Sequence, residues 1–536
     1  MVDIEKWTEA RRFTPEKLAA ARIILEEIKN GTDVFTAIRK NPMPEVGYLA
    51  KHTLVEAYRQ LTTSGEWPTD KELLKKIRLK PVRTLSGVTT VTVLTGPHSC
   101  PGKCIFCPDD ARLPKSYLYG EPGAMRGMQN NFDPYLQVST RLEALDAVGH
   151  PIDKIELLIL GGTFTAYDQE YQEWFIRRCF DAMNGFDAKT LEEAQLANEI
   201  SDHRNVGLVI ETRPDEITPA VLAYLRLLGV TKVQIGAQSL DDHLLTINKR
   251  GHTAGETLRA VCQLRAAGFK VVLHWMPNLL GATLLSDHED FTRLWSGGYC
   301  PDEIKIYPTQ LVENSELYTI WQQGKYQPYS TEELIQLIAD LKTTIPRYCR
   351  VNRVIRDIPS TLIAAGNKRS SLRMDVQLEL ERRGQHCQCV RCREVRGEQV
   401  EAGELNFHDL SYTAPASQEH FLSFDTSNDK LAGYLRLSLP DLTQNEEIRQ
   451  TMPDLKGAAI IREVHVFGQA QPVGGGETGA AQHSGLGTRL LLEAEKIALA
   501  NGFKRLAVIA AVGTRQYYQK RGFARGTHYF VKELSD

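Results

Sequence analysis

The chain has 536 residues, of which 42% are hydrophobic and 24% charged, and its formal net charge is −3. This composition is that of a globular protein, and the length predicts two or three domains. No apolar run approaches the roughly 20 residues that cross a bilayer, and the first residues, MVDIEKWTEARR, contain acids and no apolar signal segment. We therefore expect a cytoplasmic protein that makes no membrane association, in which clustered cysteines bind metals rather than form disulfides.

Residues 1–83 have the periodicity of helices. Apolar positions in TPEKLAAARIILEEIKNG recur at helical spacing, Thr14 suits the helix start, and Gly31 suits its end. Two further segments, PEVGYLAKHTLVEAYRQLTTSG and TDKELLKKIRLK, follow the same pattern. The pattern predicts a small helical domain that exposes basic residues.

Six short apolar runs alternate with helix-length segments over residues 84–345. They are VTVLTG, IELLILGGT, VGLVIETRPD, KVQIGAQS, KVVLHWMPN and EIKIYPTQ. Strands at this crossover spacing predict parallel βαβ units in an α/β fold, here a partial (β/α)6 barrel, with functional residues at the carboxyl ends of the strands. Those ends carry Gly161, Gly162, Thr163, Glu211, Gln238, His274 and Lys305. Ordinary loop polarity is the alternative for any one of them.

Three cysteines follow the first strand in the stretch GPHSCPGKCIFCP. Cys100, Cys104 and Cys107 supply three thiolates, whereas full protein ligation of a four-iron, four-sulfur cluster (4Fe–4S) takes four. The open iron then has room for the amino and carboxylate groups of S-adenosylmethionine (SAM). A zinc site completed by His98 or by a distant residue is the alternative.

The strand ends supply what SAM needs. The glycines at 161 and 162 let backbone approach the methionyl amine, and Glu211 or Gln238 can meet the nucleoside. The three cysteines and the GGT sequence together resemble the radical-SAM superfamily.

The stretch 346–397 is basic, with twelve Lys or Arg against five Asp or Glu, which is enough to attract phosphates. Taken alone, such a patch is more often a solvated basic surface, so phosphate binding needs support from elsewhere in the chain. It also contains Cys387, Cys389 and Cys392 within six residues. We interpret these three as a structural zinc site whose fourth ligand, such as His386 or His408, is unresolved. A second iron–sulfur cluster is the alternative.

Residues 398–536 predict mainly antiparallel strands and one helix. In QHSGLGTRLLLEAEKIA, Gln482, Gly485 and Gly487 precede that helix, where exposed N–H groups suit a pyrophosphate. A dinucleotide-binding fingerprint is the competing interpretation, but the following GTRQYYQKRGF matches the ending of GCN5-related acetyltransferases. There a tyrosine, Tyr517 or Tyr518, acts as general acid toward the departing thiolate. REVHVFG would be the strand whose backbone pairs with the pantetheine arm of coenzyme A.

These motifs, in this order over nearly the whole chain, resemble the catalytic subunits of Elongator, the tRNA carboxymethyluridine synthases, with the short cysteine spacing of the bacterial and archaeal type. The resemblance implies a radical-SAM barrel followed by an acetyltransferase (GNAT-type) α+β domain. It implies that a SAM-derived 5′-deoxyadenosyl radical takes hydrogen from the methyl group of acetyl-CoA. The carbon radical then adds to C5 of the wobble uridine at position 34 of tRNA, and thioester hydrolysis leaves 5-carboxymethyluridine.

The resemblance also implies a set of site residues. The candidate catalytic residues are Lys154, His465, Tyr517 and Tyr518, although His465 has a core position as its alternative. The implied acetyl-CoA contacts are Lys154, Glu463, Val464, His465, Val466, Leu486, Gly487, Thr488 and Tyr518. The N-terminal helices and the basic stretch around Arg347 to Arg396 would hold the anticodon stem-loop of tRNA.

Several points stay open at the level of sequence: the electron donor, the tRNA species, and whether the chain forms a homodimer. Two rival functions also remain. One is a protein lysine acetyltransferase whose cluster is merely structural, which predicts activity without SAM. The other is a tRNA-binding scaffold that senses acetyl-CoA, which predicts turnover near background.

Overall fold

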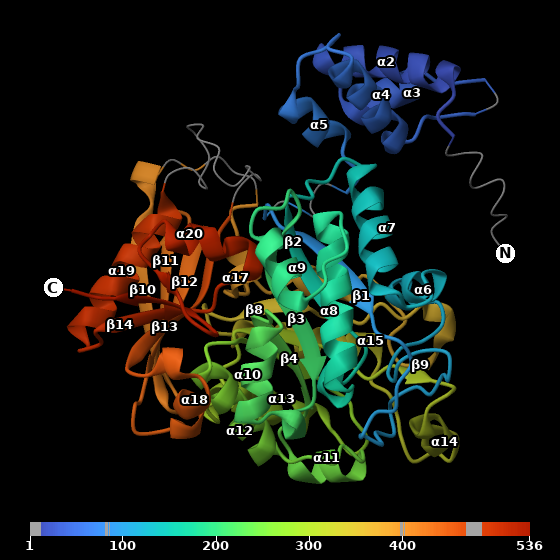
Figure 1. Ribbon diagram of the computed structural model, residues 1–536. Helices are drawn as coiled ribbons and strands as arrows, with labels where there is room; N and C mark the ends of the chain where they lie inside the picture. The colour runs from blue at the N-terminus through green and yellow to red at the C-terminus, as the bar shows by residue number, and fades with distance from the viewer. Residues whose placement is uncertain are drawn as a thin grey trace.

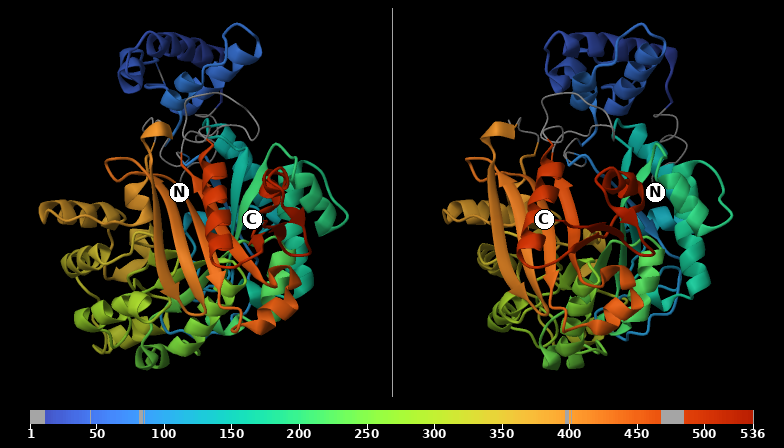
Figure 2. Two further views of the ribbon diagram at one scale, coloured as in Figure 1. Left: turned by 90° about the vertical axis from the view of Figure 1, so that its left-hand side faces the viewer. Right: turned by 60° about the vertical axis from the view of Figure 1, so that its left-hand side comes forward.

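A computed structural model of the chain describes residues 12–44, 46–80, 84, 86–396, 400, 402–467 and 485–535 (Figure 1). A group of N-terminal helices lies at one end of the molecule, above two β-sheets that lie side by side (Figures 1 and 2). One buried apolar core runs through both sheets and their helices, whereas the N-terminal helices have a core of their own.

The N-terminal helices are α2 (Pro15–Lys29), α3 (Val34–Lys40), α4 (Lys51–Thr63) and α5 (Lys71–Ile77). Thr14 caps α2 by accepting a hydrogen bond from the backbone of Lys17, as the sequence pattern predicts. The group is joined to the first sheet's layer through Arg59 on α4, which lies 2.6 Å from Asp146 at the end of α7 (Pro134–Asp146).

The first sheet has seven parallel strands in the order β1-β2-β3-β4-β5-β6-β8. Its strands are β1 (Thr89–Leu94), β2 (Lys154–Leu160), β3 (Arg204–Thr212), β4 (Lys232–Gln238), β5 (Lys270–Trp275), β6 (Glu303–Ile306) and β8 (Arg350–Arg353). The edge strands β1 and β8 do not pair, so the barrel is incomplete. The six predicted strands are all present, and β8 is a seventh that lies within the basic stretch.

Helices cover the outside of this sheet. They are α6 (Pro122–Gln129), α7, α8 (Gln169–Asn184), α9 (Leu191–Asn198), α10 (Pro219–Leu227), α11 (Asp242–Ile247), α12 (Ala254–Ala266), α13 (Leu284–Ser296) and α15 (Thr331–Thr343). A small ribbon of β7 (Leu311–Val312) and β9 (Ile363–Ala365) lies beside α14 (Glu316–Gln322). The basic stretch continues through α16 (Leu372–Arg382) and α17 (Val390–Arg393), and it packs on the barrel through α15 and β8.

The second sheet has the order β10-β11-β12-β13-β14-β16-β15. Its strands are β10 (Asn406–Ala414), β11 (Ser417–Asp425), β12 (Leu431–Pro440), β13 (Ala458–Val466), β14 (Arg505–Val508), β15 (Ala524–Arg525) and β16 (Phe530–Glu533). Only β13 and β14 are parallel, and their pairing extends just from residue 458 to residue 461 of β13. The rest of β13, up to Val466, therefore has a backbone edge that β14 does not cover.

The helices of the second domain are α18 (Glu446–Thr451), α19 (Leu486–Ala500) and α20 (Arg515–Gln519), and α19 packs on β11, β12 and β13. Buried hydrogen bonds join the second domain to the barrel domain. Arg436 on β12 donates to the carbonyl of Tyr348 at 2.7 Å, and Tyr529 donates to that of Ala267 at 2.5 Å. Among the described residues, no helix is long and apolar enough to span a bilayer.

Candidate active site

One continuous cavity of about 1840 Å³ runs through the barrel and reaches the second sheet. Alternate residues of each barrel strand line it, as expected where successive side chains point to opposite faces. On β4 these are Lys232, Gln234, Gly236 and Gln238; the cysteines at 100, 104 and 107 line the end near the strand C-termini. Glu463, His465 and Tyr518 of the second domain line it as well. The predicted cluster site and the predicted acetyl-CoA site thus share one cavity.

The first cysteine group lies on the loop after β1. Cys100 Sγ is 3.6 Å from Thr163 Oγ1, and Cys107 Sγ is 3.0 Å from Ser116 Oγ. Arg250 donates to Cys104 Sγ at 3.0 Å. A hydrogen bond from the Cys107 thiol and the charge of Arg250 together outweigh burial and lower the pKa of Cys104 to about 5. Sequence reasoning missed Arg250, which has no motif that marks it.

The surroundings of these cysteines fit an iron–sulfur cluster with bound SAM. Two cationic groups, Arg213 and Arg250, face three thiols, and Arg213 Nη1, Arg250 Nε and Gln238 Oε1 are buried without a hydrogen-bond partner. Such orphaned polar atoms are unusual unless a ligand meets them. A Cβ at Gly161 would collide with Thr95 Oγ1, so only glycine allows the backbone at this position to come so close to Thr95.

Glu211 and Gln238 differ in their surroundings. Gln238 ends β4 with a positive φ of 70° beside the cysteine end of the cavity. Glu211 on β3 instead accepts a hydrogen bond from Tyr117 at 3.0 Å and lies 3.6 Å from the Lys305 ammonium group. The assignment of both to the SAM nucleoside stays a prediction.

The exposed edge of β13 is the expected place for the pantetheine arm. The Glu463 carboxylate, however, is held by Lys270 of the barrel, by Tyr434 at 2.8 Å and by Arg436 at 2.9 Å. Only its backbone is therefore left for a thioester ligand. The ring centroids of His465 and Phe467 are 4.4 Å apart, and burial lowers the pKa of His465 to about 4, so the imidazole is neutral.

The helix α19 starts with Gly485 at φ 70°, followed by Leu486, Gly487 and Thr488. A Cβ at Gly487 would lie 2.6 Å from the Tyr517 hydroxyl, so this turn packs directly against α20. Arg521 donates to Thr488 Oγ1 at 3.0 Å and lies 3.6 Å over the Tyr517 ring. Arg521 brings a cation to the expected pyrophosphate position, and it lies within the motif GTRQYYQKRGF, whose tyrosines alone were expected to act. Gln482 lies outside the described residues.

The two tyrosines occupy different positions. Tyr517 lies over the start of α19, whereas Tyr518 is buried and lines the cavity with His465. Burial raises the pKa of Tyr518, so its hydroxyl stays protonated.

Lys154 begins β2 opposite Arg204 of β3, and a Cβ at Gly513 of the second domain would strike the Cβ of Arg204. Lys154 therefore lies beside the contact between the two domains, and burial lowers its pKa. Its role toward acetyl-CoA stays a prediction.

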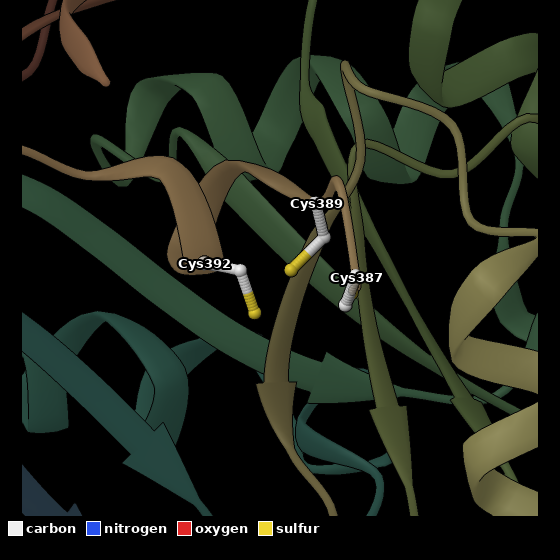
Figure 3. A group of neighbouring side chains, drawn as sticks. All are labelled: Cys387, Cys389 and Cys392. Carbon is white, nitrogen blue, oxygen red and sulfur yellow. The ribbon is translucent and has the colours of Figure 1, made fainter. Parts of the chain in front are cut away.

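The second cysteine group forms around the start of α17. The sulfur atoms of Cys387, Cys389 and Cys392 lie within 4.8 Å of one another, and the side chains gather at one point (Figure 3). His386 and His408 are exposed and do not belong to this group. The three thiols fit one small ion better than an extended cluster.

Many cations of the basic stretch already have partners. Arg353, Arg356 and Arg383, for example, pair with Asp357, Glu121 and Glu379 at 2.7–2.9 Å. In contrast, Arg373, Arg391 and Arg396 line the cavity and form no salt bridge with any residue that the structure describes. These three are the better candidates for contacts with phosphates.

The chain is similar to known proteins in both sequence and structure. Residues 94–292 match the radical SAM superfamily and residues 301–382 its C-terminal domain. The chain is 42% identical over 97% of its length to the tRNA uridine(34) acetyltransferase of Methanocaldococcus jannaschii, covering 99% of that protein. It is 36% identical over 95% of its length to Elongator complex protein 3 of Homo sapiens, covering 95% of that protein.

A solved structure of Methanocaldococcus infernus Elp3 with an N-terminal deletion is similar, with a TM-score of 0.73 and 38% identity over 84% of this chain and 99% of that one. The radical SAM match and the relatives named tRNA uridine(34) acetyltransferase together make this chain an acyltransferase-type radical SAM enzyme. It belongs to the family of the tRNA uridine(34) acetyltransferases and Elongator complex protein 3.

Proposed function

We propose that this chain is a tRNA wobble-uridine C5-carboxymethyl synthase, which joins the methyl carbon of acetyl-CoA to C5 of uridine 34. One methyl hydrogen would leave on 5′-deoxyadenosine and the C5 hydrogen as a proton, with SAM as the two-electron oxidant, and thioester hydrolysis would release coenzyme A. The observation that carries the proposal is the shared cavity, which is lined both by the three cysteines at 100, 104 and 107 and by Glu463, His465 and Tyr518 of the second domain. A protein lysine acetyltransferase has no need of a cavity that connects these two sites. The names of the relatives, which state uridine 34, give further support.

Three cysteines and their neighbours would hold the cofactors. Cys100, Cys104 and Cys107 would ligate a 4Fe–4S cluster, and Arg250 would donate to one ligand sulfur. When bound, the cluster and SAM supply a 5′-deoxyadenosyl radical that removes hydrogen from the acetyl methyl group. The glycines at 161 and 162 would let the backbone approach the methionyl part of SAM.

The second domain would bind acetyl-CoA and supply a proton to the coenzyme A thiolate as it leaves. The open edge of β13 from residue 462 to 466 would pair with the pantetheine arm, and the start of α19 with Arg521 would hold the pyrophosphate. Tyr518 would donate a proton to the departing coenzyme A thiolate, since its raised pKa keeps the hydroxyl protonated.

The tRNA would enter through the open side of the barrel, between β1 and β8. Arg373, Arg391 and Arg396 line the cavity there and would contact phosphates of the anticodon stem-loop, so binding should weaken with salt. Zinc is the ion that we propose for Cys387, Cys389 and Cys392, with a structural role beside this entrance.

The test uses anaerobically reconstituted full-length protein with SAM, acetyl-CoA, a reductant and tRNA that contains uridine 34. Nucleosides of the digested tRNA are analysed by mass spectrometry for 5-carboxymethyluridine, with Cys104→Ala as the inactive variant and Cys262→Ala, a half-buried lone cysteine, as the matched control. Product from the wild type and Cys262→Ala alone supports the proposal. No product from protein that has a full cluster and binds tRNA would contradict it.

A further inference from the structure

A layer of polar side chains crosses the inside of the barrel above its floor. The floor is a set of charges at the starts of the strands, where Lys232 lies 2.6 Å from Glu156 and Lys270 lies 3.4 Å from Glu303. Two to four residues further toward the carboxyl ends of the strands comes the polar layer, which we define by its members Glu211, Gln234, His274, Lys305 and Tyr307, all of them lining the cavity. The polar layer therefore lies between the floor and the cysteine end.

The lysines of the floor and of the polar layer differ in how many of their hydrogen-bond donors are already used. Lys232 and Lys270 on the floor each reach two carboxylates. In the polar layer the ammonium group of Lys305 has one ion-pair partner among the described residues, Glu211, at 3.6 Å. This distance exceeds that of a good hydrogen bond, so Lys305 retains donors for a ligand in the cavity.

His274 lies beside Lys305 in the register of β5 and β6. Its Nε2 atom is 2.9 Å from Gln234 Oε1, a buried contact in which the amide oxygen accepts. Nε2 therefore carries the ring proton, and Nδ1 keeps its lone pair. Burial, with the charges of Lys305, Arg356, Arg250 and Arg353, holds the pKa of His274 far below its usual value, so the ring stays neutral.

His274 and Lys305 together complement the hydrogen-bonding edge of one nucleobase, uracil. Uracil presents an N3–H donor flanked by two carbonyl acceptors. A lone pair on His274 Nδ1 and the ammonium group of Lys305 offer an acceptor next to a donor. Cytosine has a lone pair at N3, which would face the lone pair of His274 Nδ1. Two acceptors would then oppose each other inside a buried site, and this arrangement disfavours the wrong base.

We propose that His274 and Lys305 read the Watson–Crick edge of the target uracil after the base leaves the anticodon stack, so that the polar layer is the specificity pocket for the modified base. This inference rests on the proposed function. A flipped base in this layer would lie between the acetyl-CoA end and the cysteine end of the cavity, where its C5 atom can meet the acetyl methyl carbon. The Tyr307 ring, edge-on to His274 with a centroid distance of 5.5 Å, would form one wall.

The test compares two tRNAs that differ only at position 34, with U or C. Their dissociation constants are measured for the full-length holoenzyme, and product is assayed separately. We expect the wild type to bind the U34 tRNA about tenfold more tightly, which is in the lower part of the discrimination that one base edge provides. His274→Phe should bring the two affinities together, whereas the affinity for C34 tRNA should persist because phosphate contacts dominate it.

Two further variants sharpen the test. His274→Gln keeps an acceptor and should retain part of the preference for U34, and His243→Phe, on the exposed surface of α11, should retain all of it. An unchanged C34 affinity shows that each variant is folded. A His274→Phe enzyme that still prefers U34 tenfold, beside a wild type that makes 5-carboxymethyluridine, would overturn this inference alone. A wild type that prefers U34 but makes no such product would overturn the proposed function instead.

Discussion

Arg462 of the second sheet donates to both carboxylate oxygens of Asp302 in the barrel, at 2.7 and 2.8 Å, with neither side chain exposed. Glu419 accepts from the same guanidinium at 2.7 Å. This buried pair fixes the acetyltransferase sheet against the strand starts of the barrel. Because the two domains share the cavity, the pair also fixes the distance between the two halves of the site.

Arg462→Met should therefore destabilise the protein. It leaves two buried carboxylates without their main cation, which costs about 3–5 kcal/mol. Urea unfolding followed by circular dichroism would measure this loss. The matched control is Arg505→Met, whose surface pair with Glu533 at 3.0 Å should contribute less than about 1 kcal/mol. Equal losses in the two variants would show that the interdomain pair has no special role.

Stability should also fall in acid because of Glu463. Burial would raise the pKa of this carboxyl, but Lys270 and Arg436 outweigh burial and hold the pKa at about 2, below the ordinary 4.5. The contribution is present in full above pH 4.5 and is lost as the pH falls toward 2, with a size of about 3 kcal/mol. Urea midpoints from pH 6 to pH 3 would show the decline. Glu463→Gln should be less stable at pH 7 and less dependent on pH; an equally steep decline would assign the effect to other carboxyls.

Sequence patterns predict those parts of the fold that depend on local chemistry. The six apolar strands are predictable from the sequence because helices bury them, so that their residues are apolar. The strand β8 (RVNR) has a single apolar residue, and its position is set by pairing with β6. Short sequence motifs likewise contain the cysteines, the glycines at the start of α19 and both tyrosines.

The charged floor and the polar layer are not predictable in this way. Lys232, Lys270 and Glu303 each look like solvated residues at the start of a strand, and their partners are far apart in the chain. Only the pairing of the strands in one sheet brings them together inside the incomplete barrel. The same holds for Arg250, whose contact with Cys104 depends on the position of the loop between α11 and α12.

Arg250 should tune the redox potential of the cluster. A cation that donates to a ligand sulfur stabilises the more negative, reduced state, so its removal makes reduction harder. Arg250→Gln should lower the midpoint potential of the reconstituted cluster by tens of millivolts, measured by an anaerobic redox titration with electron paramagnetic resonance. Arg259→Gln, on the outer helix α12, is the control. An unchanged potential in Arg250→Gln would show that this hydrogen bond does not reach the cluster.

The second cysteine group should hold zinc independently of the first. Cys389→Ser removes one of three sulfurs that lie within 4.8 Å of one another, so it should release one equivalent of zinc. Elemental analysis would measure the zinc, and the visible absorption of the iron–sulfur cluster would report the other site. Cys104→Ser should give the reverse result. Iron lost along with Cys389 would favour a second cluster instead of zinc.

The two adjacent tyrosines should differ in kinetic effect. Tyr518 lines the cavity with a hydroxyl that a raised pKa keeps protonated, so it can give a proton to the departing thiolate. Tyr518→Phe should lower kcat for coenzyme A release about 100-fold, the lower end of general-acid effects, and leave KM for acetyl-CoA nearly unchanged. Tyr517 instead packs on Gly487 at the start of α19, so Tyr517→Phe should mainly raise KM. Thiol release assayed in the presence of tRNA measures both constants. If Tyr517→Phe lowered kcat and Tyr518→Phe raised KM, the assignment of the two tyrosines would have to be exchanged, because only a residue that contacts the reacting thioester can act on the chemical step.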